Sequence, residues 1–294
     1  MKFEWKYTGS QPRKLRSALI HEGVSTSLIK VAVYHGGSMQ INGEDRWTVD
    51  MVKPGDNFSL TLPPEEGNDH VEASELPIDI VYEDRDFLVL NKPAGVATVP
   101  AHNVVVADSL VNRVKGYYER QHYENLTIHV ATRLDKDTSG LVVFPKHRFA
   151  HAIMDQQLKK HTVKKNYYAV VGGQVNAQHG YIDAPIAREP GKFVSRTVLP
   201  SGKPSVTEYW LEKSSPKMSL LKIRLHTGRT HQIRVHFRYC KHPLIGDEMY
   251  GGEMLIPRQA LHCYWMKFYS PFKKQFIEIQ APLPDDMKEL INQI

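Results

Sequence analysis

The pattern of apolar and polar positions changes character twice along the chain. Residues 1–62 combine apolar residues at helical spacing, from Leu15 to Tyr34, with the alternating stretch Phe58–Leu62. Residues 63–77 are polar, acidic and rich in turn residues, whereas residues 78–294 are rich in strand-forming residues. The pattern therefore predicts a small N-terminal unit over 1–62, a linker over 63–77 and a larger domain over 78–294.

Two turn signals divide the N-terminal unit. Asn42-Gly43 is a strong hairpin dipeptide, and Lys53-Pro54-Gly55-Asp56 contains a second turn. We therefore expect helices first and then a small strand-turn-strand. Three basic residues, Lys14, Arg16 and Lys30, accompany the helical part.

The larger domain mixes strands and helices. Strand composition marks Ile78–Asn91, Leu141–Pro145, Tyr167–Gly172, Val206–Leu211 and Leu220–Leu225. Helices are expected over Ala107–Arg120, Phe149–Leu158, His231–Tyr239 and Asp285–Ile291. Because no regular βαβ repeat connects these elements, we expect an α+β fold with a mixed sheet flanked by helices.

Charge and composition narrow the class of protein. The 294 residues carry a net charge of +6, which favours a polyanionic partner. The two cysteines, Cys240 and Cys263, are too few for a disulfide framework or a thiolate zinc site, and they suit a reducing cytoplasm. No apolar stretch approaches the ~20 residues that span a bilayer. We therefore expect a cytoplasmic protein without a membrane partner.

The stretch Thr132–Leu141 concentrates charged residues in front of an apolar strand. It reads Thr-Arg-Leu-Asp-Lys-Asp-Thr-Ser-Gly-Leu, so that Asp135 and Asp137 lie beside Gly140. A glycine there permits a tight turn. On composition alone, a solvated loop with surface ion pairs explains this stretch as well as a reactive carboxylate does.

The stretch Leu225–His236 combines a strand end with a basic helix start. Arg229, Arg234 and the nearby Arg238 supply positive charge, and free N–H groups at a helix start suit an anion. A basic helix face in water is the alternative explanation.

The stretch Lys164–Gly172 carries a basic run into a strand that contains Tyr167 and Tyr168. Aromatic residues among cations can stack bases and hold phosphates. A tyrosine that is simply packed in the sheet is the alternative.

Together these stretches resemble the RluA family of pseudouridine synthases, and in particular its RluD-like members. Arg133-Leu134-Asp135-Lys136-Asp137-Thr138-Ser139-Gly140 is similar to the catalytic motif of that family. Further segments, before and after this motif, are similar to the family in order and spacing: Ile80–Asp84, Asn91–Gly95, Lys165–Tyr167, Gly202–Pro204, Thr227–Arg234, Pro243–Asp247 and Leu261-His262. The resemblance covers about residues 76–275. It implies a pseudouridine synthase fold with a mixed, mainly antiparallel central sheet.

Residues 1–62 are more loosely similar to the S4-type RNA-binding domain that often precedes this catalytic domain. One position departs from the family pattern, because Thr132 stands where the family often has His. The departure affects the contact that this His would make near the RNA and leaves the carboxylate in place.

The resemblance assigns roles to individual residues. Asp135 is implied as the catalytic carboxylate, which acts on the sugar or as a base at C2′, with Arg234 as its charge partner and Tyr167 stacked on the uracil. Substrate-binding positions are implied for Arg133, which fills the gap left by a flipped base, for Ile233 as an apolar wall, and for Lys165, Arg229, His231 and Leu261. Asp137 is expected to stabilise the loop.

The reaction needs no redox step or phosphoryl transfer, so no cofactor is expected. His226, His231 and His236 are spaced five apart. Metal-binding pairs on a helix usually sit four apart, so no metal site is expected.

Two other functions remain open at this point. A non-catalytic RNA-binding protein would also be basic and aromatic. A hydrolase could use Asp135 and Asp137, but glycosidase carboxylates stand ~5–10 Å apart across a bond. Ser139 lacks the nucleophile-elbow pattern. The expected partner is RNA, ribosomal RNA of the large subunit first and transfer RNA second, bound by a monomer.

Overall fold

The computed structural model describes residues 1–68, 71–100 and 108–294. Residues 1–62 form their own sheet, in the order β1-β6-β3-β4. Its elements are β1 (Lys2–Lys6), β2 (Arg13–Lys14), α1 (Leu15–His21), α2 (Thr26–Tyr34), β3 (Ser38–Ile41), β4 (Glu44–Asp45), β5 (Met51–Val52) and β6 (Asn57–Thr61). The expectation of helices followed by strands is therefore corrected, because β1 precedes both helices and pairs with β6.

Both predicted turns lie between strands. Asn42 and Gly43 adopt positive φ angles of 51° and 85° between β3 and β4, as a two-residue hairpin turn requires. At the second turn, the Asp56 carboxylate accepts a hydrogen bond from the backbone N–H of Lys53 at 2.8 Å. These local contacts fix the strand register of the small sheet.

The larger domain is built on one mixed sheet. Its order is β11-β14-β15-β10-β16-β9-β8-β7, with β17 paired to β16. The strands are β7 (Ile80–Glu83), β8 (Phe87–Lys92), β9 (Ser139–Pro145), β10 (Lys164–Gly172), β11 (His179–Asp183), β14 (Val206–Ser214), β15 (Met218–Leu225), β16 (Leu261–Ser270) and β17 (Gln275–Gln280). Only the β16–β9 pair is parallel among the described pairs of this sheet, so the predicted α+β class is confirmed.

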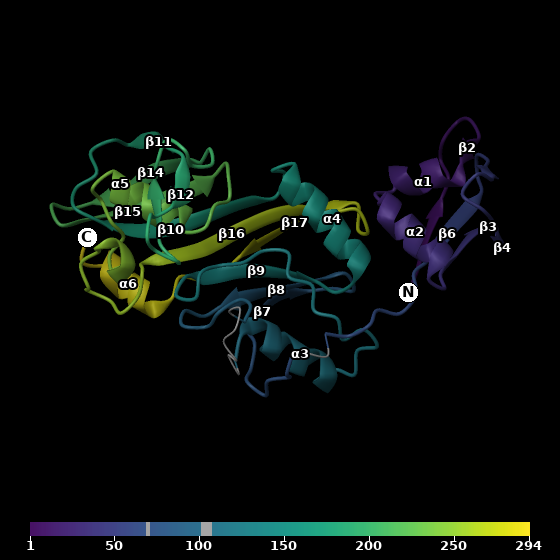
Figure 1. Cartoon of the computed structure of the whole chain (residues 1–294), viewed down its shortest axis with the longest axis horizontal. Coiled ribbons are helices and arrows are strands. Elements are labelled where there is room, and N and C mark those ends of the chain that lie inside the picture. The colour runs from purple at the N-terminus through teal and green to yellow at the C-terminus, as the bar shows by residue number, and fades with distance from the viewer. Residues whose placement is uncertain (69–70, 101–107) are drawn as a thin grey trace.

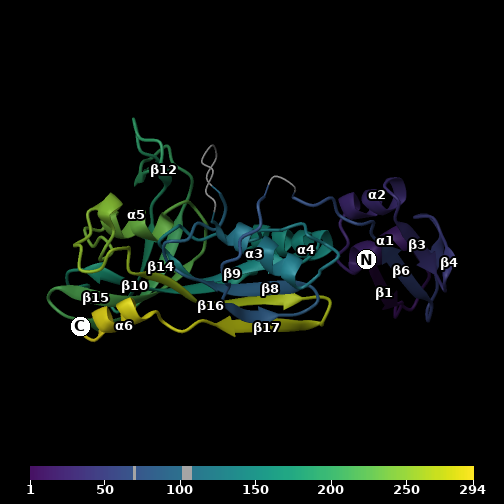
Figure 2. The ribbon, with the colours of Figure 1, turned by 90° about the horizontal axis from the view of Figure 1, so that it is seen from below.

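Helices lie on both faces of this sheet. α3 (Leu110–Arg120) packs on Leu88 and Val142, whereas α4 (Arg148–Lys159) packs on Val89 and Val143, which alternate to the other face. α5 (Gln232–Tyr239) joins the α4 face and α6 (Asp285–Ile291) the α3 face. Figure 2 shows α5 and α6 on opposite sides of the strands.

The predicted helices coincide closely with α4, α5 and α6, and the first part of the predicted Ala107–Arg120 helix falls on Ala107, which lies outside the described residues. The hairpin β12 (Ile186–Arg188) and β13 (Arg196–Val198), together with β11, β16 and β17, was not predicted. In Figure 2 this hairpin stands out from the body of the domain. A short 3₁₀ turn, η1 (Glu248–Tyr250), follows α5.

Aromatic rings join the N-terminal unit to the larger domain. Phe3 of β1 meets Phe149 of α4 edge-on, with ring centroids 5.0 Å apart, and lies 5.9 Å from Phe272. Ile153 also belongs to this apolar cluster. Figure 1 shows the unit beside α4, at the opposite end from α5. A linker was expected over 63–77, but these packed rings also hold the unit against the larger domain.

The linker region is also bound to the larger domain. The Glu65 carboxylate accepts hydrogen bonds from the backbone N–H of Arg148 and contacts His129 Nε2, each at 2.8 Å. Val71 is buried under α3. Residues 63–68 and 71–77 contain no helix or strand, and these contacts bind them to the surface of the larger domain. Within the described ranges, no helix has the length and apolar character to cross a membrane.

Candidate active site

The loop of residues 133–138 lies at the start of β9, and backbone contacts hold it in place. The buried Lys92 ammonium donates to the carbonyl of Lys136 at 2.8 Å, and Thr98 Oγ1 donates to the carbonyl of Leu134 at 2.9 Å. Gly140 has a φ of 113°, and a Cβ there would lie 2.2 Å from the carbonyl oxygen of Cys263. Only glycine lets β9 approach β16 this closely, so Gly140 fixes where the loop ends.

Asp135 projects from this loop onto α5. Its Oδ2 accepts a hydrogen bond from Nη1 of Arg234 at 3.0 Å, across 99 positions of sequence. The Asp135 side chain is 28% exposed and that of Arg234 is 7% exposed. The predicted ion pair is therefore present, with the carboxylate open to a ligand on one side and its cation buried behind it.

A second carboxylate holds the arginine. Asp247 accepts from Nε of Arg234 at 2.7 Å and from Nη2 at 2.9 Å, and Asp247 is buried. Although burial acts in the opposite direction, Asp247 and then Asp135 raise the pKa of the Arg234 guanidinium above its usual value. Arg234 is thus a permanent cation whose position is set by Asp247, and it presents its remaining edge to Asp135.

His231 lies on the other side of Asp135. Its Nε2 is 3.8 Å from Asp135 Oδ2, and its Nδ1 is 2.8 Å from the hydroxyl of Tyr250. Its backbone is left-handed, with φ of 56°, a conformation that non-glycine residues adopt at a cost. Burial lowers the pKa of His231, so the imidazole is neutral at physiological pH. The Tyr250 hydroxyl accepts from the backbone N–H of Arg196, which leaves its own proton for Nδ1.

Three of the predicted site residues come from β10, α5 and β16. Tyr167, Ile233 and Leu261 are all buried in the core of the α4 face. Burial, and then the neighbouring Cys263 and Asp135, raise the pKa of Tyr167 well above 10. Tyr167 is therefore a neutral phenol, which can donate a proton in a hydrogen bond but is a poor base.

Lys165 lies two residues before Tyr167 on β10 and therefore on the same face of the sheet. Burial lowers the pKa of its ammonium, and the neighbouring Cys263 partly opposes this. The Lys165 side chain therefore lies near Cys263, on the face of the sheet that carries Tyr167.

Two of the predicted RNA-binding arginines lie at the surface. Arg133 and Arg229 are exposed, and Nε of Arg229 donates to the carbonyl of Pro204 at 3.3 Å. Thr132 is buried, and its Oγ1 accepts from the backbone N–H of Val143 at 3.1 Å. Thr132 therefore braces β9 from inside and is not presented to a ligand. Asp137 contributes its backbone carbonyl, which accepts from Arg258 Nη1 at 3.3 Å.

The three histidines that were considered as metal ligands have three different sets of partners. His226 contacts Glu208 at 2.8 Å, His231 contacts Tyr250, and His236 lies between Thr207 and the carbonyl of Ala184. Within the described residues, no group of three or more His, Cys, Asp or Glu side chains is arranged so that it could hold a metal ion.

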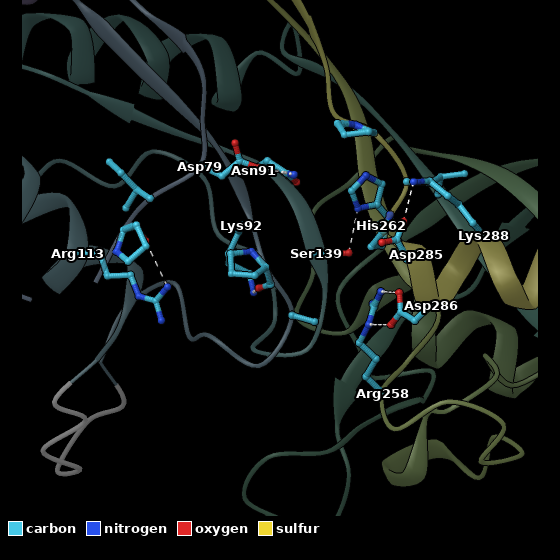
Figure 3. Close-up of a pocket in the computed structure, with 17 residues that line it drawn as sticks. Asp79, Asn91, Lys92, Arg113, Ser139, Arg258, His262, Asp285, Asp286 and Lys288 are labelled. Atoms are coloured by element: carbon cyan, nitrogen blue, oxygen red, sulfur yellow. Dashed lines mark hydrogen bonds and ion pairs between the residues drawn. The ribbon is translucent and has the colours of Figure 1, made fainter. Parts of the chain in front are cut away.

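A pocket of about 770 Å³ lies between β8, β16 and α6, beside Ser139 at the start of β9. Figure 3 shows Ser139 and His262 facing one another in it, and Ser139 Oγ is 2.9 Å from His262 Nδ1. Burial lowers the pKa of His262 to about 4. Over the described part of the chain no carboxylate bonds to the other nitrogen of His262, so the pair lacks the third member of a hydrolase triad.

Sequence reasoning missed Asp247 and Tyr250. Asp247 closes the segment Pro243–Asp247, and it follows Gly246, whose φ is 74° and whose Cβ would lie 1.9 Å from the carbonyl of Arg258. A charged residue directly after a glycine in a buried apolar stretch was the available signal for Asp247. Tyr250 carried no such signal.

Comparison with known proteins agrees with this geometry. The sequence profile of the family described as RNA pseudouridylate synthase matches residues 86–239. An uncharacterized RNA pseudouridine synthase of Bacillus subtilis, YjbO, is 40% identical over 92% of this chain and 95% of its own length. Ribosomal large subunit pseudouridine synthase D of Vibrio parahaemolyticus is 36% identical over 85% of this chain and 81% of its own.

A solved structure shows the same fold. Human RNA pseudouridylate synthase domain containing 1 superposes with a TM-score of 0.60 over 75% of this chain and 96% of its own, at 23% identity. The sequence relatives, the fold and the motif that carries Asp135 point the same way. The chain belongs to the RNA pseudouridylate synthase family and is an enzyme that isomerises uridine in RNA.

Proposed function

We propose that the chain converts specific uridines of 23S ribosomal RNA to pseudouridine, with Asp135 as the catalytic carboxylate. The observation that carries this proposal is the partly exposed Asp135 carboxylate on the buried Arg234, which Asp247 holds in turn. The names of the relatives that act on the large ribosomal subunit support the choice of RNA. Transfer RNA is the second candidate.

The isomerisation breaks the bond from C1′ to N1, turns the uracil and joins C5 to C1′. The proton leaves C5, and N1 gains one, so that no atom is lost overall. Asp135 acts on the sugar, either as a nucleophile at C1′ or as a base at C2′. Arg234 is paired with this carboxylate at 3.0 Å and fixes its position beside the sugar.

The uracil cannot react while it is stacked in RNA. Flipping it out costs a few kcal/mol, which contacts to the protein have to offset. In this proposal the base enters over the apolar floor of Tyr167, Ile233 and Leu261, and the exposed Arg133 fills the gap in the RNA. Lys165, Arg229 and His231 complete the substrate contacts. The neutral Tyr167 stacks on the base and donates its hydroxyl proton in a hydrogen bond.

Mapping of pseudouridine in total RNA tests this proposal. RNA from cells that contain the protein is compared with RNA from cells that lack it and from cells that carry Asp135→Asn. Positions in 23S RNA that lose pseudouridine in both altered strains support the proposal. Losses confined to transfer RNA would show that transfer RNA is the substrate. Modification that persists with Asp135→Asn would show that Asp135 is not the catalytic carboxylate.

A further inference from the structure

The face of the large sheet opposite Tyr167 carries a set of aromatic and basic side chains. Residues paired across neighbouring strands point to the same face, so the strand register defines this set. One row across β10, β15, β14 and β11 consists of Tyr168, Lys222, Trp210 and His179, and the next row contains Arg224, Glu208 and Tyr181. We call these two rows the back face.

The back face differs from the neighbouring part of the same sheet surface. There, Val170, Met218 and Leu220 are buried under Met287 and Leu290 of α6. On the back face, Tyr181 is 59% exposed, and the side chains of His179 and Arg224 are 43% and 42% exposed. In Figure 2 α6 lies at one end of this surface. The same four strands thus present an apolar row to a helix and a polar, aromatic area to solvent.

The aromatic rings of the back face are arranged in stacks. His179 stacks on Trp210 at 5.1 Å with an interplanar angle of 18°, and the guanidinium of Arg224 lies 5.4 Å from the Trp210 ring. Tyr168 stacks on Tyr264 of β16 at 4.1 Å. Such a surface offers flat, partly exposed faces to another flat ring.

The positive charge of Arg224 is not neutralised at close range. Its nearest carboxylate oxygen, on Glu208, is 3.9 Å away, and that carboxylate already contacts Tyr181 at 2.7 Å, His226 at 2.8 Å and His179 at 3.0 Å. Within the described part of the chain, Nε of Arg224 is buried without a hydrogen-bond partner, so the exposed part of this side chain is its terminal guanidinium end. Lys222 adds a second cation, and Glu212 near Tyr168 opposes it at the edge. Arg224 therefore keeps donors for an anion.

We propose that the back face is a second RNA-binding surface, on which unpaired nucleotides stack their bases on Trp210 and Tyr181 and place phosphates beside Arg224 and Lys222. A sheet with exposed aromatic rings among cations suits single-stranded RNA, because every base has a flat face and every linkage a charge. Since this surface lies across the sheet from Tyr167, the RNA bound here is not the segment whose uridine reacts. Binding at the back face would extend the contact area between the protein and one large RNA molecule.

Binding of a ten-nucleotide oligoadenylate to the full-length protein tests the proposal. This probe contains no uridine and cannot be a substrate. The double variant Trp210→Ala with Arg224→Gln should bind it about ten-fold more weakly than the wild type. Trp210→Phe, which keeps a stacking ring, should bind within about two-fold of the wild type. Ultraviolet cross-linking of the probe should label peptides that contain Trp210 or Tyr181.

The matched control removes another exposed pair of the same kind. Lys267 lies 5.3 Å from the ring of Phe276, on the hairpin of β16 and β17. Phe276→Ala with Lys267→Gln should leave oligoadenylate affinity unchanged. Equal affinity of the back-face variant and the wild type would overturn the proposal. So would an abasic sugar-phosphate oligomer that binds as tightly as oligoadenylate, because the surface would then recognise charge alone, as for an acidic protein partner.

The back-face proposal can fail while the proposed function holds, and the reverse is also true. Back-face variants should isomerise a short RNA substrate at the wild-type rate, and the binding assay needs no chemistry at Asp135. Thermal unfolding of each variant shows whether Trp210→Ala damages the fold. If it does, Arg224→Gln and Trp210→Phe alone decide, since the first should weaken binding and the second should preserve it.

Discussion

The proposed catalytic centre and the junction of the N-terminal unit are both built from residues far apart in sequence, but by different interactions. At the centre, Asp135 and Asp247 share the cation of Arg234. At the junction, Phe3 packs between rings of the larger domain. Charge pairing fixes the position of a polar group that can react, whereas apolar packing fixes a position without defining chemistry. Truncation of a side chain at the centre should therefore reduce activity, whereas truncation at the junction should reduce stability.

The largest effect is expected for Asp135→Asn. Loss of the carboxylate should lower the rate of pseudouridine formation on the order of 10⁴-fold or more. Stability should change little, because Arg234 keeps both hydrogen bonds to Asp247. Single-turnover assays and thermal unfolding measure the two. Activity of the Asn variant above a trace, together with an inactive Asp137→Asn, would transfer the role to Asp137.

Arg234→Leu should damage activity and stability together. It leaves Asp247 buried without its partner, which typically costs ~3–5 kcal/mol of unfolding free energy. The double variant Arg234→Leu with Asp247→Leu removes both charges and should regain stability without regaining activity. Chemical denaturation of the three proteins measures this. A single variant as stable as the wild type would show that the buried network does not stabilise the fold.

Phe3→Ala should damage stability alone. Truncation of a buried Phe typically costs ~3–5 kcal/mol, because a cavity remains. The rate of isomerisation of a short RNA should stay unchanged, since Phe3 is part of the junction. Phe276→Ala, at a ring that is 62% exposed, is the matched control and should be nearly neutral. A catalytic defect in Phe3→Ala at a temperature where it is folded would couple the junction to the centre.

Deletion of residues 1–62 should weaken binding of long structured RNA. If this unit is S4-like, it supplies phosphate contacts, so the dependence of affinity on salt should become shallower. The melting temperature should also fall, since Phe149, Ile153 and Phe272 lose their cover. Activity on saturating short RNA should persist. Unchanged affinity and an unchanged salt slope, with only a lower melting temperature, would leave the unit a structural cover.

A smaller effect is expected when the pH is lowered, because the contacts of Glu65 between the linker and the larger domain should weaken. Burial acts against it, but His129 and the Arg148 backbone lower the pKa of Glu65 below its usual value. Its contribution to stability is therefore complete above the ordinary pKa of 4.5 and is lost as the pH falls through the lower, folded value. The protection of the Arg148 amide against hydrogen exchange, relative to its intrinsic rate, should decrease as the pH falls below 4.5 in the wild type. Glu65→Gln should show weak protection at every pH. The same pH dependence in this variant as in the wild type would show that titration of Glu65 is not responsible.

Part of this architecture was visible in the sequence. The motifs located Asp135, Arg234 and the floor of the site, because each lies in a local pattern that fixes its chemistry. Asp285–Ile291 was found at its correct bounds. β16 was missed because its residues fill both faces of the sheet, so no alternation of apolar and polar positions appears. β1 does alternate, as Lys-Phe-Glu-Trp-Lys, and was overlooked.

The contacts that the sequence did not indicate are long-range ones. Phe3 packs on Phe149, but no sequence pattern links these two positions. Each phenylalanine is an ordinary residue for the strand or helix that contains it. The same holds for Tyr250 and His231, whose contact depends on how η1 follows α5. Local residue types determine elements and reactive groups, whereas the pairing of remote apolar surfaces emerges only when the sheet is assembled.

The parallel pairing of β9 with β16 also sets an order of events during synthesis. β9, which follows the loop of residues 133–138, pairs at Ser139 and Gly140 with His262 and Cys263. Contacts across so many residues form late, because a long loop must close first. During translation the first 138 residues can leave the ribosome and the loop still lacks its neighbour. The enzyme therefore acquires its active centre only when the last strands arrive.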